Sequence, residues 1–198
     1  MAAVAAMLVL AMAALQPARA EVSIDITRGN VEPMAIAITD FFGAARTESD
    51  LGAQLSSVIS ADLERSGIFA PIDKRAFMQT AASMNVRPRF SDWRVIKAVA
   101  LINGSVEVLE GGQVRVSFRL WDVFAEEQML GQAFVTDQGN WRRVAHMIAD
   151  RIYKRLTGED GYFDTRIVYV AESGPKKRRI KRLAIMDQDG AGHRFLTD

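Results

Sequence analysis

The spacing of apolar residues predicts two strands and a helix in the first third of the chain. Apolar and polar residues alternate over residues 22–27, which is the period of a strand with one apolar face. A continuous apolar run at residues 35–38 indicates an interior strand, buried on both faces. Apolar residues then recur with helical spacing over residues 50–66, where Ser49 or Asp50 is placed to cap the helix.

The middle of the chain changes to a pattern of strands that ends in a second helix. Residues 83–92 are expected to be irregular, with a turn at Ser91 and Asp92. An antiparallel meander follows, and then a helix with an apolar stripe that Asn140 caps. Because such a stripe needs a sheet face to cover, residues 21–162 are predicted to form one α/β domain with a mixed sheet and two main helices. The strands of the meander are expected at residues 98–109, 114–120 and 129–135.

The last part of the chain, residues 163–198, has a different pattern. Short strands at residues 166–171, 180–186 and 193–196 are separated by turns rich in glycine and aspartate. This pattern is typical of a β-meander blade, and a lone blade cannot bury both of its faces. We therefore expect residues 163–198 to begin a β-propeller that the chain leaves incomplete.

The first 20 residues have the pattern of a secretory signal peptide. Residues 2–15 are entirely apolar, and a helix of that length would rise about 21 Å, short of the roughly 30 Å of membrane hydrocarbon. A cleavage pattern of small residues ends at Ala20. The mature chain is expected to start at Glu21, in an exported protein.

Composition narrows the possible chemistry. The chain has 25 basic and 24 acidic residues, so it lacks the strong positive charge of many nucleic-acid-binding proteins. It has no cysteine, which excludes disulfides, thiol nucleophiles and thiolate zinc sites. Two histidines leave little scope for metal or Ser-His chemistry, and the sequence has no phosphate-binding loop of the P-loop type. No catalytic residue, cofactor site or metal site is predicted, and the chain is not expected to be an enzyme.

Four motifs suggest chemistry but favour plainer interpretations. The basic run at residues 176–182 lacks interleaved aromatic residues, so it is interpreted as a solvated turn and no nucleic-acid partner is expected. The segment Asp187–Gly190 starts like a calcium loop, but its glycine and its twelfth residue do not fit, which favours a β-turn. The carboxylate pairs at 126–127 and 159–160 are predicted to be solvated turn charges. His146, whose next candidate metal partner is Asp150, is predicted to be a partly buried or surface residue.

Four stretches together resemble the TolB family of the Tol–Pal system, and the similarity covers nearly the whole mature chain. They are EVSIDITRG (21–29), AIAITDFFG (35–43), DLGAQLSSVISADLERSGIFAPIDKRAFMQ (50–79) and YVAESGPKKRRIKRLAIMDQDGAGHRFLT (169–197). The third stretch is the most specific, and the fourth matches the opening of the first propeller blade. The resemblance implies an N-terminal α/β domain followed by a six-bladed β-propeller.

The resemblance also implies a function in binding other proteins of the periplasm. A mobile segment at the mature N-terminus would bind the C-terminal domain of TolA, and the propeller would bind the lipoprotein Pal. The protein would thereby lie peripheral to the outer membrane and support its integrity and its constriction during cell division. The TolA-binding segment maps onto Glu21, Val22, Ser23, Ile24, Asp25, Ile26, Thr27, Arg28 and Gly29.

The residues of this segment also fit strand addition to a partner. Val22, Ile24 and Ile26 lie on one face of a strand, so they can fill pockets while the main chain pairs with an exposed sheet edge. Three alternatives stay open. First, the segment can be a permanent edge strand of its own domain. Second, the chain can belong to a secreted enzyme with a catalytic propeller. Third, the chain can be a structural protein associated with the outer membrane, in which this segment is not a mobile switch.

Overall fold

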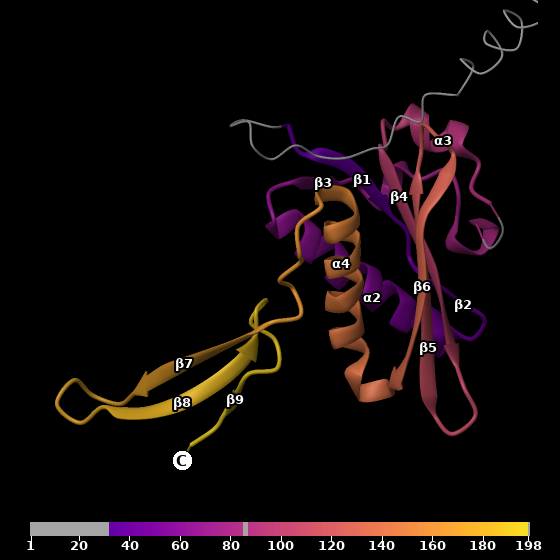
Figure 1. Cartoon of the computed structure of the whole chain (residues 1–198). Helices are drawn as coiled ribbons and strands as arrows, with labels where there is room; N and C mark the ends of the chain where they lie inside the picture. The colour runs from indigo at the N-terminus through magenta and orange to yellow at the C-terminus, as the bar shows by residue number, and fades with distance from the viewer. Residues whose placement is uncertain (1–31, 85–86, 198) are drawn as a thin grey trace, which may run out of the picture.

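The computed structural model of the chain describes residues 32–84 and 87–197. An α/β domain comes first, and a separate three-stranded sheet follows it (Figure 1). None of the helices within the described ranges is both long and apolar enough to cross a membrane. The signal peptide and the strand predicted at residues 22–27 lie outside these ranges. The sheet of the α/β domain consists of β1 (Met34–Ile38), β2 (Phe42–Gly43), β3 (Phe69–Pro71), β4 (Ala100–Val108), β5 (Gln113–Asp122) and β6 (Glu127–Asp137).

The domain has a mixed sheet, as predicted. Its strands follow the order β3-β1-β4-β5-β6, and β2 pairs with β4 off this path. Strand β1 lies parallel between β3 and β4, which explains why residues 35–38 read as a continuous apolar run. Strands β4, β5 and β6 form the predicted antiparallel meander. Gly111 and Gly112 turn the first hairpin with φ of 90° and 82°, a conformation that glycine adopts without steric cost.

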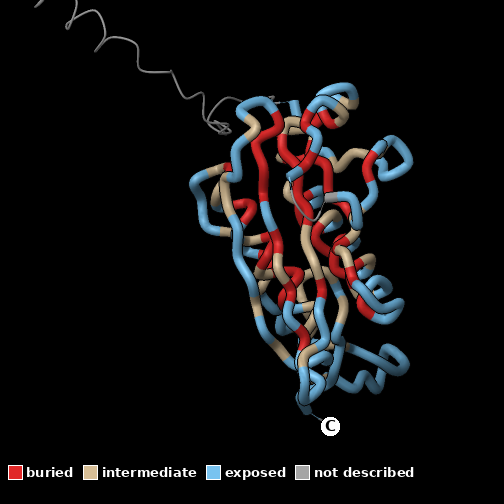
Figure 2. Tube along the Cα trace, turned by 90° about the vertical axis from the view of Figure 1, so that its right-hand side faces the viewer, coloured by how far each residue is buried: buried red, intermediate tan, exposed pale blue. Residues whose placement is uncertain are grey.

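Two helices cover one face of the sheet, α2 (Arg46–Arg65) and α4 (Trp141–Thr157) (Figure 1). The predicted stripe of α4 is buried in the main core, where its Ile148 and Ile152 have no exposed surface. Burying one such side chain contributes about 1.5–3 kcal/mol to stability. Buried residues line both the strands and the helices of this domain (Figure 2). The second helix thus holds the meander as expected.

A smaller core lies around the short helix α3 (Phe90–Val95). Its Phe90 and Trp93 pack with Trp121 of β5, and the rings of Phe90 and Trp121 meet edge to face at 5.8 Å. The expectation of an irregular segment over residues 83–92 is wrong at this point, because Ser91 and Asp92 are helical. Burial of the Phe90 and Trp93 rings stabilises this short helix. The local sequence does not indicate that burial. The other short helices are the 3-10 turns η1 (Lys74–Ala76), η2 (Ala81–Met84) and η3 (Gln138–Asn140).

Helix α2 begins earlier than predicted, and neither Ser49 nor Asp50 caps it. Its N-cap is Ala45, which has no polar side chain, so Glu48 takes over the role. One carboxylate oxygen of Glu48 accepts a hydrogen bond from the Ala45 amide at 2.9 Å, and the other accepts from the Val108 amide at 2.8 Å. These backbone hydrogen bonds lower the pKa of Glu48. The helix start is therefore fixed partly by the end of β4, 60 residues away in sequence.

The second sheet consists of β7 (Arg166–Ser173), β8 (Ile180–Asp187) and β9 (Arg194–Phe195), in that order and antiparallel. It confirms the three strands predicted for this region. It extends away from the α/β domain on the side of α4 (Figure 1). Its strands are mostly exposed, and Ala184 is the only apolar residue of the three strands that is fully buried among those described.

Candidate functional site

The predicted partner-binding segment, Glu21–Gly29, lies outside the described residues. The structure describes the point where this part of the chain joins the domain. Glu32 and Pro33 are exposed, and Met34 begins β1. The connection to the domain is therefore at the surface, where a partner can reach it.

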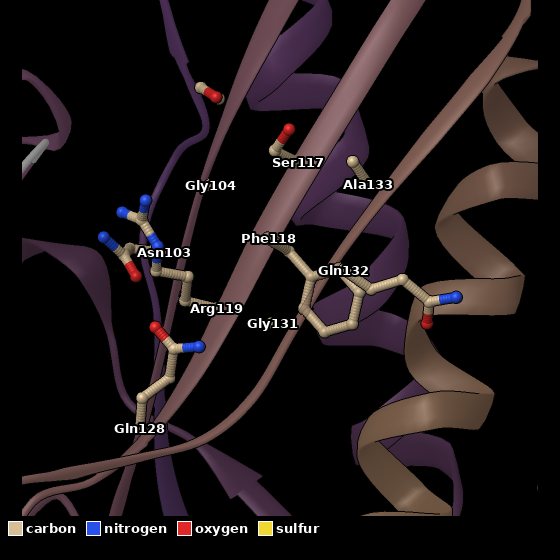
Figure 3. A pocket seen from close by; sticks show the side chains of 10 residues that line it. Asn103, Gly104, Ser117, Phe118, Arg119, Gln128, Gly131, Gln132 and Ala133 are labelled. Atoms are coloured by element: carbon tan, nitrogen blue, oxygen red, sulfur yellow. The ribbon is translucent and has the colours of Figure 1, made fainter.

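A groove of about 360 Å³ lies on the sheet face opposite α2 and α4. Arg119 of β5 lies between Asn103 of β4 and the side chain of Gln128 of β6, whereas Phe118 points toward the helices (Figure 3). Small residues leave room for the groove, because Ser117 pairs with Ala133 and Arg119 pairs with Gly131. Arg119 lines the groove, whereas Arg115 of the same strand forms an ion pair with Glu107 at 2.9 Å.

The groove can donate hydrogen bonds to a polypeptide. Its lining offers amides, hydroxyls and one guanidinium, and no carboxylate or imidazole stands among them to activate a hydroxyl. It adjoins β6, the last strand of the path, whose outer edge pairs with no strand among the described residues. An unpaired edge beside a polar groove is a surface for binding an extended chain.

A buried polar cluster lies where α2, α4 and the turn after β8 meet. His146 of α4 is 2% exposed, and its Nδ1 lies 2.6 Å from Oδ2 of Asp62 on α2, whose side chain is fully buried. Nε2 of His146 faces Oδ2 of Asp189 at 3.8 Å and has no hydrogen-bond partner among the residues that the structure describes. Because an ionised carboxylate only accepts hydrogen bonds, the Nδ1–H of His146 donates a hydrogen bond to Asp62. The cluster joins the α/β domain to the second sheet.

Charged and polar neighbours complete this cluster. The guanidinium of Arg142 bonds the carboxylate of Asp189, and Arg65 donates to Asp62 at 3.2 Å. Burial lowers the pKa of His146, but the hydrogen bond to Asp62 and the charges of Asp62 and Asp189 outweigh it and raise the pKa above 6.5. Burial likewise acts to raise the pKa of Asp189, and hydrogen bonds from the Ala191 amide and Arg142 bring it below its usual 3.8. An imidazolium is thus favoured at this position.

The expectations for His146 are corrected by these contacts. It is neither a surface nor a partly buried residue, and its neighbours are Asp62 and Asp189 rather than Asp150. Asp150 instead accepts hydrogen bonds from the amides of Phe163, at 2.7 Å, and Asp164, at 3.1 Å. It therefore holds the segment that leaves α4. Sequence reasoning missed Asp62 because its partner lies 84 residues away.

The other motifs have structural roles. Gly190, with φ of 86°, forms the predicted turn with Asp187, whose carbonyl accepts a hydrogen bond from the Gly190 amide at 2.9 Å. Residues 176–179 are exposed, as predicted for the basic turn. Within the carboxylate pairs, Glu126 bonds Arg94 at 2.9 Å and Asp160 bonds Lys154 at 2.5 Å, so these two are ion pairs rather than free charges.

Comparisons with known proteins identify the family. The model of the TolB amino-terminal domain matches residues 22–129. The Tol-Pal system protein TolB of Paramagnetospirillum magneticum is 58% identical over all 198 residues, which span 44% of that protein. A crystal structure of TolB from Acinetobacter baumannii matches 90% of this chain and 42% of its own with a TM-score of 0.69 and 25% identity. The chain thus spans less than half the length of these relatives, and it belongs to the TolB family through its amino-terminal domain.

Proposed function

We propose that this chain is a periplasmic, non-enzymatic, protein-binding component of the Tol–Pal system. The match of the TolB amino-terminal domain to residues 22–129 carries this proposal. The relative from Paramagnetospirillum magneticum is named a Tol-Pal system protein. The signal-peptide pattern of residues 1–20 supports export, and the groove beside β6 supports binding rather than catalysis.

The partner segment of this proposal is Glu21–Gly29, which binds the C-terminal domain of TolA. It adds as a strand to an edge of TolA, with main-chain hydrogen bonds supplying affinity and Val22, Ile24 and Ile26 filling pockets. The junction at Glu32 and Pro33 supports this role, since both residues are exposed.

The second part of the proposal assigns residues 163–198 to the start of a β-propeller that binds Pal. The three-stranded sheet presents apolar side chains to solvent, which a soluble protein normally covers. Neighbouring blades of a propeller would cover them. The exposed apolar residues of this sheet and its end are Ile167, Val168, Val170, Ile180, Leu183, Phe195 and Leu196.

Hydrogen exchange tests this assignment. Backbone amides of β7 and β8 are expected to exchange faster than those of β4 and β5, because many apolar side chains of the second sheet are exposed to solvent within the described ranges. Mass spectrometry of peptides from both regions measures the difference. Slower exchange in β7 and β8 than in β4 and β5 would contradict the assignment to an unfinished propeller.

Deletion of residues 21–29 tests the partner segment. The deletion is expected to abolish binding to the TolA C-terminal domain in calorimetry, while circular dichroism shows that the α/β domain stays folded. Loss of the fold would show that the segment is structural. Absence of TolA binding by the undeleted mature chain, combined with activity on a panel of peptides or sugars, would favour the enzyme alternative.

Matched triple variants test how the segment binds. Val22→Ser/Ile24→Ser/Ile26→Ser removes the apolar face and is expected to weaken TolA binding by at least about 100-fold. Ser23→Ala/Asp25→Ala/Thr27→Ala changes the opposite face and is expected to alter the affinity by less than about tenfold. Equal losses from both variants would contradict binding by one face of a strand.

A further inference from the structure

Among the described residues, the imidazole of His146 is approached by one carboxylate from the α/β domain and one from the second sheet. Asp62 belongs to the α/β domain, and Asp189 belongs to the turn between β8 and β9. Gln188 of the same turn also reaches Asp62, with its amide 3.4 Å from Oδ1. The second sheet therefore docks on the α/β domain through polar groups, of which the side chains of His146, Asp62 and Asp189 are at most 6% exposed.

The protonation of His146 decides whether this contact is attractive. A neutral ring that donates from Nδ1 to Asp62 turns a bare lone pair of Nε2 toward the Asp189 carboxylate at 3.8 Å. A buried lone pair without a donor loses the hydrogen bond that water would supply. A protonated ring presents an N–H and a positive charge to both carboxylates, so each unit gains an ion pair with the same side chain.

We propose that His146 is a proton-operated lock that holds the β7–β9 sheet against the α/β domain. In its protonated form the imidazolium bridges Asp62 and Asp189. In its neutral form the turn keeps its contacts through Arg142 and Gln188 but loses the charged bridge, and the second sheet moves more freely. This lock does not require TolA to be the partner of the chain.

The groups around the ring are consistent with a proton rather than a metal ion. Arg65 on α2 already bonds Asp62, and Arg142 on α4 already bonds Asp189. Asp150, also on α4, has its two oxygens occupied by the Phe163 and Asp164 amides. The two carboxylates that face the ring are therefore balanced by two guanidinium groups, and a divalent cation would add two further positive charges in a buried space. A proton adds one, shared between both carboxylates.

The pH dependence follows from the sign of the pKa shift. The pKa of His146 is raised above 6.5 in the docked form, because Asp62 and Asp189 favour the charged ring more than burial disfavours it. Because Asp62 and His146 belong to the same unit, docking adds the charge of Asp189 to the ring. The stabilisation of the docked form is therefore fully present below the undocked pKa and is lost as the pH rises through the docked pKa. Protection against hydrogen exchange in β8 and β9 falls by about tenfold for each unit by which the docked pKa exceeds the undocked one.

Hydrogen exchange and NMR on the 198-residue chain test the lock. Exchange of amides in residues 180–196 is measured from pH 5.5 to 8.5 and corrected for intrinsic rates, while the His146 ring signals are titrated. We expect an apparent pKa above 6.5 and a loss of protection that follows the same curve. His193→Gln is the matched control, because this second histidine is exposed, and its pH dependence is expected to match that of the unchanged chain.

Two variants make the lock falsifiable. His146→Gln keeps a hydrogen-bond donor for Asp62 but cannot titrate, and it is expected to make protection independent of pH. Asp189→Asn alters only the turn, so it avoids a folding failure of the α/β domain, and it is expected to lower the pKa of His146 and flatten the profile. An unchanged pH dependence in either variant, or a constant protection in the unmodified chain, would overturn the proposal. Protection at pH 8 that rises with Zn²⁺ and is reversed by EDTA would also overturn it and assign a metal site instead.

Discussion

Replacing Asp62 with alanine is expected to lower the free energy of unfolding by about 3 kcal/mol. The carboxylate is fully buried, accepts from His146 at 2.6 Å and from Arg65 at 3.2 Å, and supplies the charge that faces the imidazole. Its removal leaves the buried Nδ1–H of His146 without its acceptor, and the cost of such a group exceeds the net contribution of the pair that held it. Thermal unfolding followed by circular dichroism should show a Tm about 6–12 °C lower.

The control for this variant is Asp62→Asn. Its side-chain oxygen can still accept the Nδ1–H of His146, so a smaller loss is expected, at about half that of alanine. An alanine variant as stable as the unmodified chain would contradict a structural role of this carboxylate in joining α2 to α4.

Replacing Gly52 with alanine is expected to lower the free energy of unfolding by about 2 kcal/mol. A Cβ at this position would lie 2.0 Å from the carbonyl oxygen of Phe41 and 2.9 Å from its carbonyl carbon, so helix α2 must shift to accommodate it. Such a shift displaces the core, because the Phe41 ring is 1% exposed. The better helix propensity of alanine, about 1 kcal/mol, offsets only part of this cost.

Gly139→Ala is the matched control. Apart from its two chain neighbours, no described residue has an atom within 4 Å of a Cβ built there, and its φ is not positive. Its stability is expected to change by less than about 0.5 kcal/mol. Circular dichroism melts of both variants measure the contrast. A Gly52→Ala chain that unfolds at the same temperature as the Gly139→Ala chain would show that α2 does not depend on close approach to Phe41.

Elements that depend on local pattern were predicted well. The apolar run of β1, the stripe of α4 and the three strands of the second sheet all lie where the sequence placed them, within a few residues. The turn at Gly111 and Gly112 and the end of α4 at Gly158 have the same local origin, because these glycines adopt positive φ. In each case the information lies within a few residues of the element itself.

Elements that depend on distant partners were predicted poorly. Helix α2 starts at Arg46 because Glu48 bonds an amide of β4 as well as its own helix start. Helix α3 forms because Phe90 and Trp93 pack with Trp121 of β5 in the smaller core. The pattern of neighbouring residues predicts neither contact, because both join residues that are far apart in sequence.

The sequence by itself determined the order of the elements, the two-part organisation and the resemblance that led to the family. These follow from side-chain periodicity, turn residues and stretches of continuous similarity, which are all properties of neighbouring residues. Only the tertiary structure decided that His146 is buried between Asp62 and Asp189. Those carboxylates are separated from it by 84 and 43 positions, and burial with charge pairing arises only when the folded chain brings three elements together and excludes water.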